Sequence, residues 1–280
     1  MSALTIADML GAAQLRLNDS DSPRADAEIL LAHVMQRSRS YFVAWPDAQL
    51  TLDEAAAFEA LLARRVAGEP VAYLLGSRGF YGLDLAVSPA VLIPRAETEV
   101  LVEAALERLP NKACRVADLG TGSGAIALAL ASLRSDAQVV AVDMSPEALS
   151  VAQENARNLN LVVDFRLGDW CGGLADDVFD MIVSNPPYIR ADDEHLAQGD
   201  VRFEPRLALT SGADGLDAIR VIIACAPAHL KPGGWLLFEH GYDQAEAVAG
   251  LLRAAGWQAV ESLQDLLGHF RVTLGRRSVE

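Results

Sequence analysis

The stretch with the most evident chemistry is VSNPPYIR (183–190), whose first residue ends the apolar segment FDMIV (179–183). Two consecutive prolines remove two backbone donors and disfavour a helix, so the turn is rigid. We expect the Asn185 side-chain oxygen and the Pro186 carbonyl to converge as two acceptors, with the Tyr188 ring beside them. Such a pocket suits a planar group carrying an NH₂, held close to an electrophile. Asn185, Pro186 and Tyr188 are the candidate catalytic residues, and together with Pro187 they form the candidate substrate site.

A glycine-rich loop, DLGTGSGAIALALA, precedes this turn by about sixty residues and separates a predicted strand from a predicted helix. Glycine permits positive φ and a close approach of the backbone to a ligand. The spacing is G-x-G-x-G, which differs from the G-x-G-x-x-G of dinucleotide binders. We predict that Gly120, Thr121, Gly122, Ser123 and Gly124 bind a cofactor, although a tight turn without a ligand would look the same.

Three further residues are predicted to lie near this loop. Asp143 follows the apolar run VVAV, 19 residues after Gly124, where nucleoside-binding α/β folds place a carboxylate that accepts ribose hydroxyls. The alternative role of Asp143 is a helix cap, for which Ser145 competes. Asp118 is placed to anchor the loop or the ligand. Trp170, in GDWCGG, is predicted to stack on or wall off an adenine ring, with core packing as the alternative.

The elements that must position these residues alternate from about residue 95 onward. Apolar strand-like segments are predicted near 114–120, 138–143, 161–169, 178–185 and 233–241, with a final strand pair near 257–274. Amphipathic helices are predicted between them. This alternation predicts a mostly parallel sheet covered on both faces, whose ligands bind at the carboxyl ends of the strands.

The first 75 residues have helical spacing throughout and contain no catalytic constellation. Ser22 with Pro23 and Thr51 with Glu54 are candidate helix starts. Two roles are open for this predicted bundle: a stabilising cap or a domain that recognises a partner. Residues 76–94 are predicted to form a β-hairpin linker.

We place the turn of that hairpin near Ser88 and Pro89, and we expect the catalytic domain to span 95–280. The polar segment 189–209 follows the NPPY turn. Loops of this length in compact domains are usually functional or disordered, so we predict a substrate-side lid, with a mobile surface loop as the alternative.

Composition excludes several classes of protein. The net charge is −15, which disfavours an extended nucleic-acid surface. No apolar run is long enough to span a bilayer, and the N-terminal residues lack a targeting pattern. The three cysteines and five histidines are scattered, so we expect reduced, buried thiols and no metal site.

The motifs DLGTGSGAIAL, VVAVDMSPEAL, GDW and VSNPPYI together resemble the class I S-adenosylmethionine-dependent methyltransferases. More narrowly, the chain resembles the release factor glutamine N5-methyltransferases, known as PrmC or HemK. Further matches are GEPVAYLLG, FYGLDLAVSPAVLIPRAETEVLV, FEPRLAL and SGADGL. The resemblance covers most of the chain and is weakest over the first sixty residues. Ala96 departs from it, because the family commonly has proline there.

The resemblance implies an α/β fold with a Rossmann-like, mostly parallel, seven-stranded sheet. It implies transfer of a methyl group from S-adenosyl-L-methionine to the glutamine of the Gly-Gly-Gln motif in class I peptide chain release factors. The cofactor would lie along Gly120–Gly124, with its ribose on Asp143, its adenine near Trp170 and its methyl group near Asn185. We expect a cytoplasmic monomer that needs no metal, yields S-adenosyl-L-homocysteine, and binds neither membrane nor nucleic acid stably.

Three other functions are compatible with parts of the pattern. An adenine N6-methyltransferase on DNA or RNA could use the same NPPY pocket for a flipped base, and the acidic charge argues against it. A non-catalytic nucleoside-binding scaffold or a dinucleotide oxidoreductase is disfavoured by the glycine spacing and by Asn185.

Overall fold

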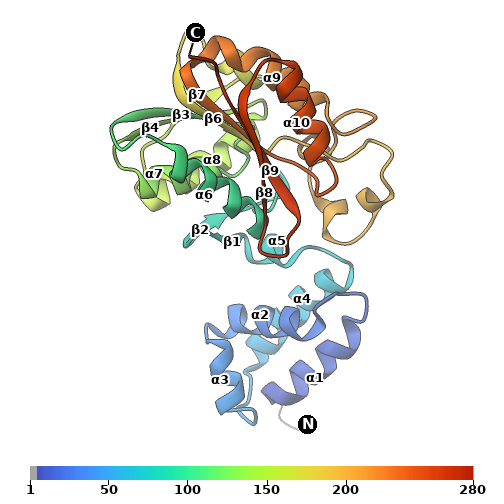
Figure 1. Cartoon of the computed structure of the whole chain (residues 1–280). Coiled ribbons are helices and arrows are strands. Elements are labelled where there is room, and N and C mark those ends of the chain that lie inside the picture. The colour runs from blue at the N-terminus through green and yellow to red at the C-terminus, as the bar shows by residue number, and fades with distance from the viewer. Residues whose placement is uncertain (1–4, 280) are drawn as a thin grey trace. The chain divides into compact units, whose positions relative to one another are not determined.

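The computed structural model of the protein describes residues 5–279, which form two compact units. The first unit comprises the chain up to Gly76 together with Glu194–Phe203, and the second comprises Ser77–Asp193 and the chain from Glu204 onward. Figure 1 shows the helices of the first unit in blue and the sheet of the second from green to red. The short segment 194–203 therefore leaves the second unit, packs within the first, and returns.

The first unit is helical. Its helices are α1 (Ile6–Arg16), α2 (Pro23–Met35), α3 (Arg39–Ala44), α4 (Leu52–Val66) and α5 (Val71–Leu75). The capping box at the start of α4 is confirmed, because Thr51 Oγ1 accepts the Glu54 N–H and Glu54 accepts the Thr51 N–H. Ser22 stands at the N-cap position of α2 but makes no capping bond with its side chain. A buried cluster that includes Leu30 and Phe58 forms the core of this unit.

The segment 194–203 is held to these helices by polar contacts. Arg65, on α4, donates through Nε to Asp26 and through a terminal nitrogen to Asp200, both over 2.7 Å. Arg202 donates to the carbonyl oxygen of Ala67 at 3.2 Å. The middle of the predicted lid is therefore anchored within the helical unit, and its role as a lid stays a prediction.

The hairpin comprises β1 (Ser77–Phe80) and β2 (Leu83–Ala86), which pair antiparallel. Its turn is at Tyr81 and Gly82, so the predicted turn near Ser88 and Pro89 is wrong. Tyr81 and Gly82 have φ of 49° and 76°. Two positive φ values are what a two-residue hairpin turn of the favoured twist requires. Pro89 misled the prediction because it belongs to a later turn, in which the Val91 N–H donates to the Ser88 carbonyl.

The second unit is built on one seven-stranded sheet of order β5-β4-β3-β6-β7-β9-β8. Its strands are β3 (Cys114–Leu119), β4 (Ala137–Asp143), β5 (Asp164–Leu167), β6 (Phe179–Ser184), β7 (Leu230–Glu239), β8 (Gln258–Gln264) and β9 (Phe270–Arg276). The first five run parallel, and β9 runs antiparallel to β7 and β8. This confirms the predicted class I methyltransferase architecture.

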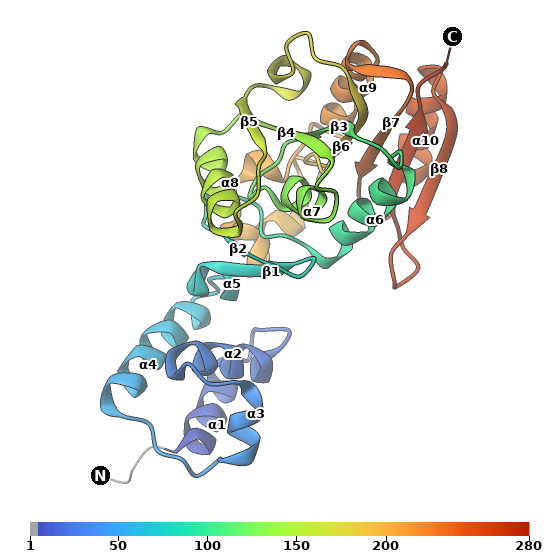
Figure 2. The same ribbon diagram turned by 90° about the vertical axis from the view of Figure 1, so that its left-hand side faces the viewer.

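Helices cover both faces of the sheet (Figures 1 and 2). One face packs on α6 (Glu99–Arg108), α7 (Ala125–Leu133) and α8 (Pro146–Leu159). The other packs on α9 (Asp217–His229) and α10 (Ala245–Ala254). Alternation along β3 explains the two cores, since Val116 belongs to the first cluster and Ala117 to the second. The strands therefore read as continuous apolar runs.

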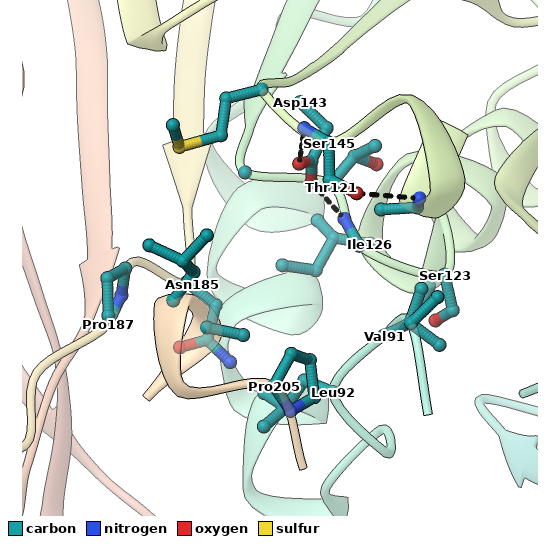
Figure 3. A pocket seen from close by; sticks show the side chains of 18 of the residues that line it. Val91, Leu92, Thr121, Ser123, Ile126, Asp143, Ser145, Asn185, Pro187 and Pro205 are labelled. Atoms are coloured by element: carbon teal, nitrogen blue, oxygen red, sulfur yellow. Dashed lines mark hydrogen bonds between the residues drawn. The ribbon is translucent and has the colours of Figure 1, made fainter. Parts of the chain in front are cut away.

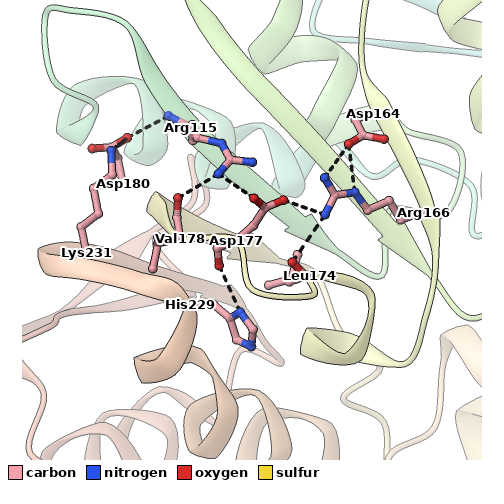
Figure 4. A network of polar contacts seen from close by, with 9 residues as sticks. All are labelled: Arg115, Asp164, Arg166, Leu174, Asp177, Val178, Asp180, His229 and Lys231. Atoms are coloured by element: carbon pink, nitrogen blue, oxygen red, sulfur yellow. Dashed lines mark hydrogen bonds and ion pairs between the residues drawn. The ribbon is translucent and has the colours of Figure 1, made fainter.

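A polar network ties together the starts of three central strands (Figure 4). Asp180 accepts the Arg115 N–H and the Lys231 ammonium, both at 2.8 Å. Asp177 accepts from the side chains of Arg115 and Arg166, which lower the pKa of Asp177 to about 2. Arg115, Asp180 and Lys231 stand at the amino ends of β3, β6 and β7, whereas Arg166 belongs to β5.

Cys171 and Cys225 form a disulfide, so the expectation of three reduced thiols is wrong for this pair. They are 54 residues apart, which concealed the pairing. The fold brings the turn after β5 beside α9, where both residues pack in the same cluster. Cys114 is free and buried.

Over 5–279, no helix is long and apolar enough to cross a membrane, and no group of three or more acidic, His or Cys side chains is placed to hold a metal.

Candidate active site

The glycine loop is the first part of the site and connects β3 to α7. Gly120, Gly122 and Gly124 have φ of 75°, 56° and 84°, in the region that L side chains rarely adopt. The N–H groups of Gly120 and Thr121 both donate to the Val142 carbonyl, which fixes the loop against β4. A Cβ on Gly124 would lie 3.0 Å from a Leu128 methyl carbon, so the loop can enter α7 there only without a side chain.

Asp143 ends β4 and holds the loop from the side. One carboxylate oxygen accepts the Gly122 N–H at 2.8 Å and the other accepts the Ser145 N–H at 2.9 Å. Ser145 caps α8 by accepting the Ala148 N–H at 3.1 Å, so the role of cap belongs to Ser145. Each carboxylate oxygen has a second lone pair, so Asp143 retains capacity to accept further hydrogen bonds.

Asp118 lies beneath the loop, where it is fully buried. It accepts the Thr121 hydroxyl at 2.6 Å, and this bond anchors the loop from below. Burial raises the pKa of Asp118 to about 7 against the opposing effect of that hydrogen bond. Of the two roles predicted for Asp118, the structure supports anchoring the loop.

Trp170 stands beside the loop, at the start of the short 3₁₀ turn that follows β5. Its ring lies so close to Gly120 that a Cβ there would be 3.1 Å from the indole. The side chain is half-buried, with the rest facing the pocket. An indole in this position forms a flat apolar wall beside the glycines.

These parts enclose one pocket at the carboxyl ends of the parallel strands (Figure 3). The predicted residues that line it are Gly120, Thr121, Gly122, Ser123, Asp143, Trp170, Asn185 and Pro187. Sequence reasoning missed two apolar contributions, one from Ala90, Val91, Leu92 and Pro94 and one from Pro205, Leu207 and Ala208. Both segments lie in stretches that match the family, FYGLDLAVSPAVLIPRAETEVLV and FEPRLAL, and this match is the signal that could have identified them. Figure 3 shows Val91 beside Ser123 of the glycine loop and Leu92 beside Pro205.

Glu204 joins the two missed segments. It is buried, and it accepts the Ile93 N–H at 3.2 Å and the Arg95 guanidinium at 2.5 Å. A buried carboxylate is stabilised by such a charged partner and backbone donor. The pocket wall from Pro205 onward is thereby fixed to the chain that precedes α6.

The NPPY turn forms the far end of the pocket. Asn185 Nδ2 donates to Thr98 Oγ1 at 3.3 Å. Asn185 Oδ1 is buried and has no hydrogen-bond partner among the residues that the structure describes. A buried, unpaired acceptor is costly, which makes it a candidate ligand-binding atom. Asn185 and Pro187 line the pocket, and Figure 3 shows both across it from Asp143.

The turn is supported from behind by residues of other elements. The Tyr188 carbonyl accepts the Gln244 side-chain amide at 2.9 Å. A Cβ on Gly215 would lie 2.2 Å from the same carbonyl oxygen, so only glycine permits this approach. These contacts fix the backbone that carries Asn185.

Tyr188 lies beside the buried Glu239 at the end of β7 and is not among the residues that line the pocket. The Tyr188 hydroxyl donates to Glu239 Oε1 at 3.4 Å. Burial raises the pKa of Glu239 to about 7, and burial with the Glu239 charge raises the pKa of Tyr188. The predictions that Tyr188 packs on the substrate and that the Pro186 carbonyl accepts from it stay predictions.

The arrangement therefore combines a carboxylate, an aromatic wall and a glycine loop with an unpaired amide oxygen. The first three fit a nucleoside with ribose hydroxyls, and the loop leaves room for a ligand against its backbone. The amide oxygen fits a group with an NH donor. Such a site can bring the two ligands together for a group transfer.

Comparison with known proteins agrees with this chemistry. Residues 8–76 match the family model of the PrmC N-terminal domain, and 96–201 match that of the methyltransferase small domain. A release factor glutamine methyltransferase of Vibrio cholerae is 51% identical over 282 residues, covering 99% of both chains. One from Xylella fastidiosa is 56% identical over 256 residues, covering 90% of this chain and 93% of the relative.

A solved methyltransferase from Pyrococcus furiosus shares the fold. It superposes with a TM-score of 0.55 at 19% identity, over 77% of this chain and 97% of the other. The near-complete coverage of relatives with about half their residues identical determines the family. The chain belongs to the release factor glutamine methyltransferases.

Proposed function

We propose that the protein transfers a methyl group from S-adenosyl-L-methionine to the side-chain amide N5 of the glutamine in the Gly-Gly-Gln motif of class I peptide chain release factors. The observation that carries the proposal is the unpaired, buried Asn185 Oδ1 in the pocket that Asp143 also lines. The names of the relatives support the same class of substrate.

At the cofactor end, Gly120–Gly124 would hold the amino-acid part of the cofactor by their backbone, and Asp143 would accept its ribose hydroxyls. Trp170 would cover the adenine. S-adenosyl-L-methionine, when bound, supplies an electrophilic methyl group on its sulfonium. The residues of this end bind and orient, and no metal is required for such a transfer.

At the substrate end, Asn185 Oδ1 and the Pro186 carbonyl would accept the two hydrogens of the glutamine NH₂, with Tyr188 and Pro187 beside it. An amide nitrogen is a poor nucleophile because its lone pair is delocalised. Two acceptors that hold its hydrogens turn the lone pair toward the methyl group, and proximity supplies most of the remaining rate enhancement. The proton would leave to water after transfer.

The helical unit has no catalytic group among its described residues, and we propose that residues 1–75 recognise a second region of the release factor. A glutamine on an exposed loop offers little surface, so specificity needs contacts elsewhere. We further propose that the protein is a cytoplasmic monomer, and the net charge of −15 argues against stable nucleic-acid binding.

The experiment is incubation with methyl-labelled S-adenosyl-L-methionine and, in separate reactions, a purified class I release factor, duplex DNA and RNA. We expect label in the release factor alone. Asn185→Ala serves as the control, with methyl transfer largely lost and cofactor binding retained. Label in DNA or RNA but not in the release factor would favour the adenine N6-methyltransferase instead.

A further inference from the structure

The Asn185 side chain can act on a substrate only in one of its two orientations. A half-turn about its last bond exchanges the amide oxygen for the amide nitrogen at almost no steric cost. The oxygen accepts a hydrogen bond from an NH₂ group, whereas the nitrogen repels it. Some other group must therefore fix which atom faces the pocket.

Thr98 is in contact with the Asn185 amide. It precedes α6, is 4% exposed, and its Oγ1 lies 3.3 Å from Asn185 Nδ2. A hydroxyl has one proton to donate and lone pairs that accept. If that proton is committed elsewhere, Thr98 can only accept from Asn185, and the amide must present its nitrogen to Thr98.

The buried Glu239 carboxylate lies beside Thr98 and is the available acceptor for that proton, since its Oε2 is buried and has no hydrogen-bond partner among the described residues. Glu239 is 1% exposed at the end of β7, and hydrogen bonds from the Thr98 and Tyr188 hydroxyls lower its pKa against the larger effect of burial. An ionised carboxylate has no proton and can only accept. The chain of donors then runs in one direction, from Asn185 to Thr98 to Glu239.

We propose that Thr98 and Glu239 are positioning residues that orient the Asn185 amide so that its oxygen faces the substrate. This inference rests on the proposed function and deepens it. Both would act through Asn185 and not on the reacting atoms, although Thr98 also lines the pocket. Their contribution is to remove the orientation in which the Asn185 nitrogen would occupy the acceptor position.

Protonation of Glu239 would reverse the direction of the hydrogen bonds that link Asn185, Thr98 and Glu239. A neutral Glu239 can donate to Thr98, which frees the Thr98 proton to bind Asn185 Oδ1 and turns the nitrogen toward the substrate. The pKa of Glu239 is about 7, and the groups that face it are Tyr188, Glu97, Arg271 and Thr98. Turnover should therefore rise with pH through about 7, as Glu239 ionises.

The test compares Thr98→Val, Thr98→Ser and Glu239→Gln in the full chain, with release factor as substrate. Valine keeps the shape of Thr98 without the hydroxyl, and we expect kcat to fall roughly tenfold or more. The Kd for S-adenosyl-L-homocysteine should stay within about twofold. Serine retains the hydroxyl and should restore most of the turnover.

Glu239→Gln removes the ionisable carboxylate, and because its amide can donate to Thr98 as well as accept from it, the direction of these hydrogen bonds is no longer fixed. We expect low turnover in this variant and no rise in kcat around pH 7. This readout holds even if Thr98→Val fails to fold.

Wild-type turnover in Thr98→Val, equal losses in the valine and serine variants, or an unchanged pH profile in Glu239→Gln would each overturn the inference. Absence of glutamine methylation by the wild-type enzyme would instead contradict the proposed function, so the two failures are distinguishable.

Discussion

Asp143 accepts the backbone N–H of Gly122 with a nitrogen–oxygen distance of 2.8 Å. The carboxylate that ends β4 is thereby bonded to the middle glycine of the loop and also lines the pocket. The Asp143 side chain thus shapes the loop and remains available to a ligand. Substitutions of Asp143 and of the loop glycines separate its effect on the loop from its effect on ligand binding.

Replacing Asp143 with alanine should weaken binding of S-adenosyl-L-homocysteine by roughly tenfold or more, because hydrogen bonds to a charged acceptor contribute about 1.5–3 kcal/mol. Isothermal calorimetry measures the affinity. Asp84→Ala on the exposed side of β2 is the matched control and should leave the affinity unchanged. Equal affinity in Asp143→Ala and wild type would remove Asp143 from the cofactor site.

Gly122 and Gly124 should respond differently to alanine. A Cβ on Gly122 meets no atom within 4 Å, so Gly122→Ala should cost only the strain of positive φ, about 1–2 kcal/mol. The added methyl should nevertheless obstruct a ligand on the loop and weaken cofactor binding.

A Cβ on Gly124 would lie 3.0 Å from Leu128 and 3.2 Å from Ala152, so Gly124→Ala should destabilise the fold more than Gly122→Ala. Urea unfolding and calorimetry measure the two effects. Full cofactor affinity in a folded Gly122→Ala protein would argue that the ligand does not lie on the loop.

Arg65 should stabilise the helical unit strongly. The side chains of Arg65 and Asp26 are 11% and 8% exposed, so Arg65→Ala leaves a buried carboxylate without its cation. Such a loss typically costs about 3–5 kcal/mol. Arg16→Ala is the control, since its pair with Glu59 is 42% and 48% exposed and contributes less than about 1 kcal/mol.

Thermal unfolding followed by circular dichroism compares these two variants. We expect a much larger drop in Tm for Arg65→Ala. Similar values of Tm for both variants would mean that the Arg65 contacts, including the one to Asp200 in the segment 194–203, are not structural.

Trp45 is the clearest candidate contact for a partner on the helical unit. It is 62% exposed beside Val43, which is 79% exposed, and exposed tryptophans are frequent centres of protein interfaces. Trp45→Ala should raise KM for the release factor several-fold while kcat and cofactor affinity stay unchanged. An unchanged KM in steady-state kinetics would count against recognition through this face and favour a stabilising cap.

Much of the fold follows from local pattern in the sequence. The alternation of apolar strands and amphipathic helices predicted the parallel sheet. Hydrophobic runs show where strands end, so the positions of the glycines and of Asp143 at strand ends could be predicted. The capping box at Thr51 and Glu54 is equally local.

The remainder depends on contacts between distant residues. Thr98 and Asn185 are 87 residues apart, and Cys171 and Cys225 are 54 apart, so neither pair is visible in a linear pattern. The same reason hid the anchoring of the segment 194–203 by Arg65. The hairpin turn was misplaced because Tyr81 adopts a positive φ that its residue type does not suggest.

The most direct measurement is tandem mass spectrometry of a class I release factor after reaction with the enzyme and S-adenosyl-L-methionine. The proposal predicts one added methyl group on the side-chain amide of the Gly-Gly-Gln glutamine. It also predicts no methylation when that glutamine is replaced by alanine. A methyl group on any other residue, or equal methylation of the alanine substrate, would contradict the proposal.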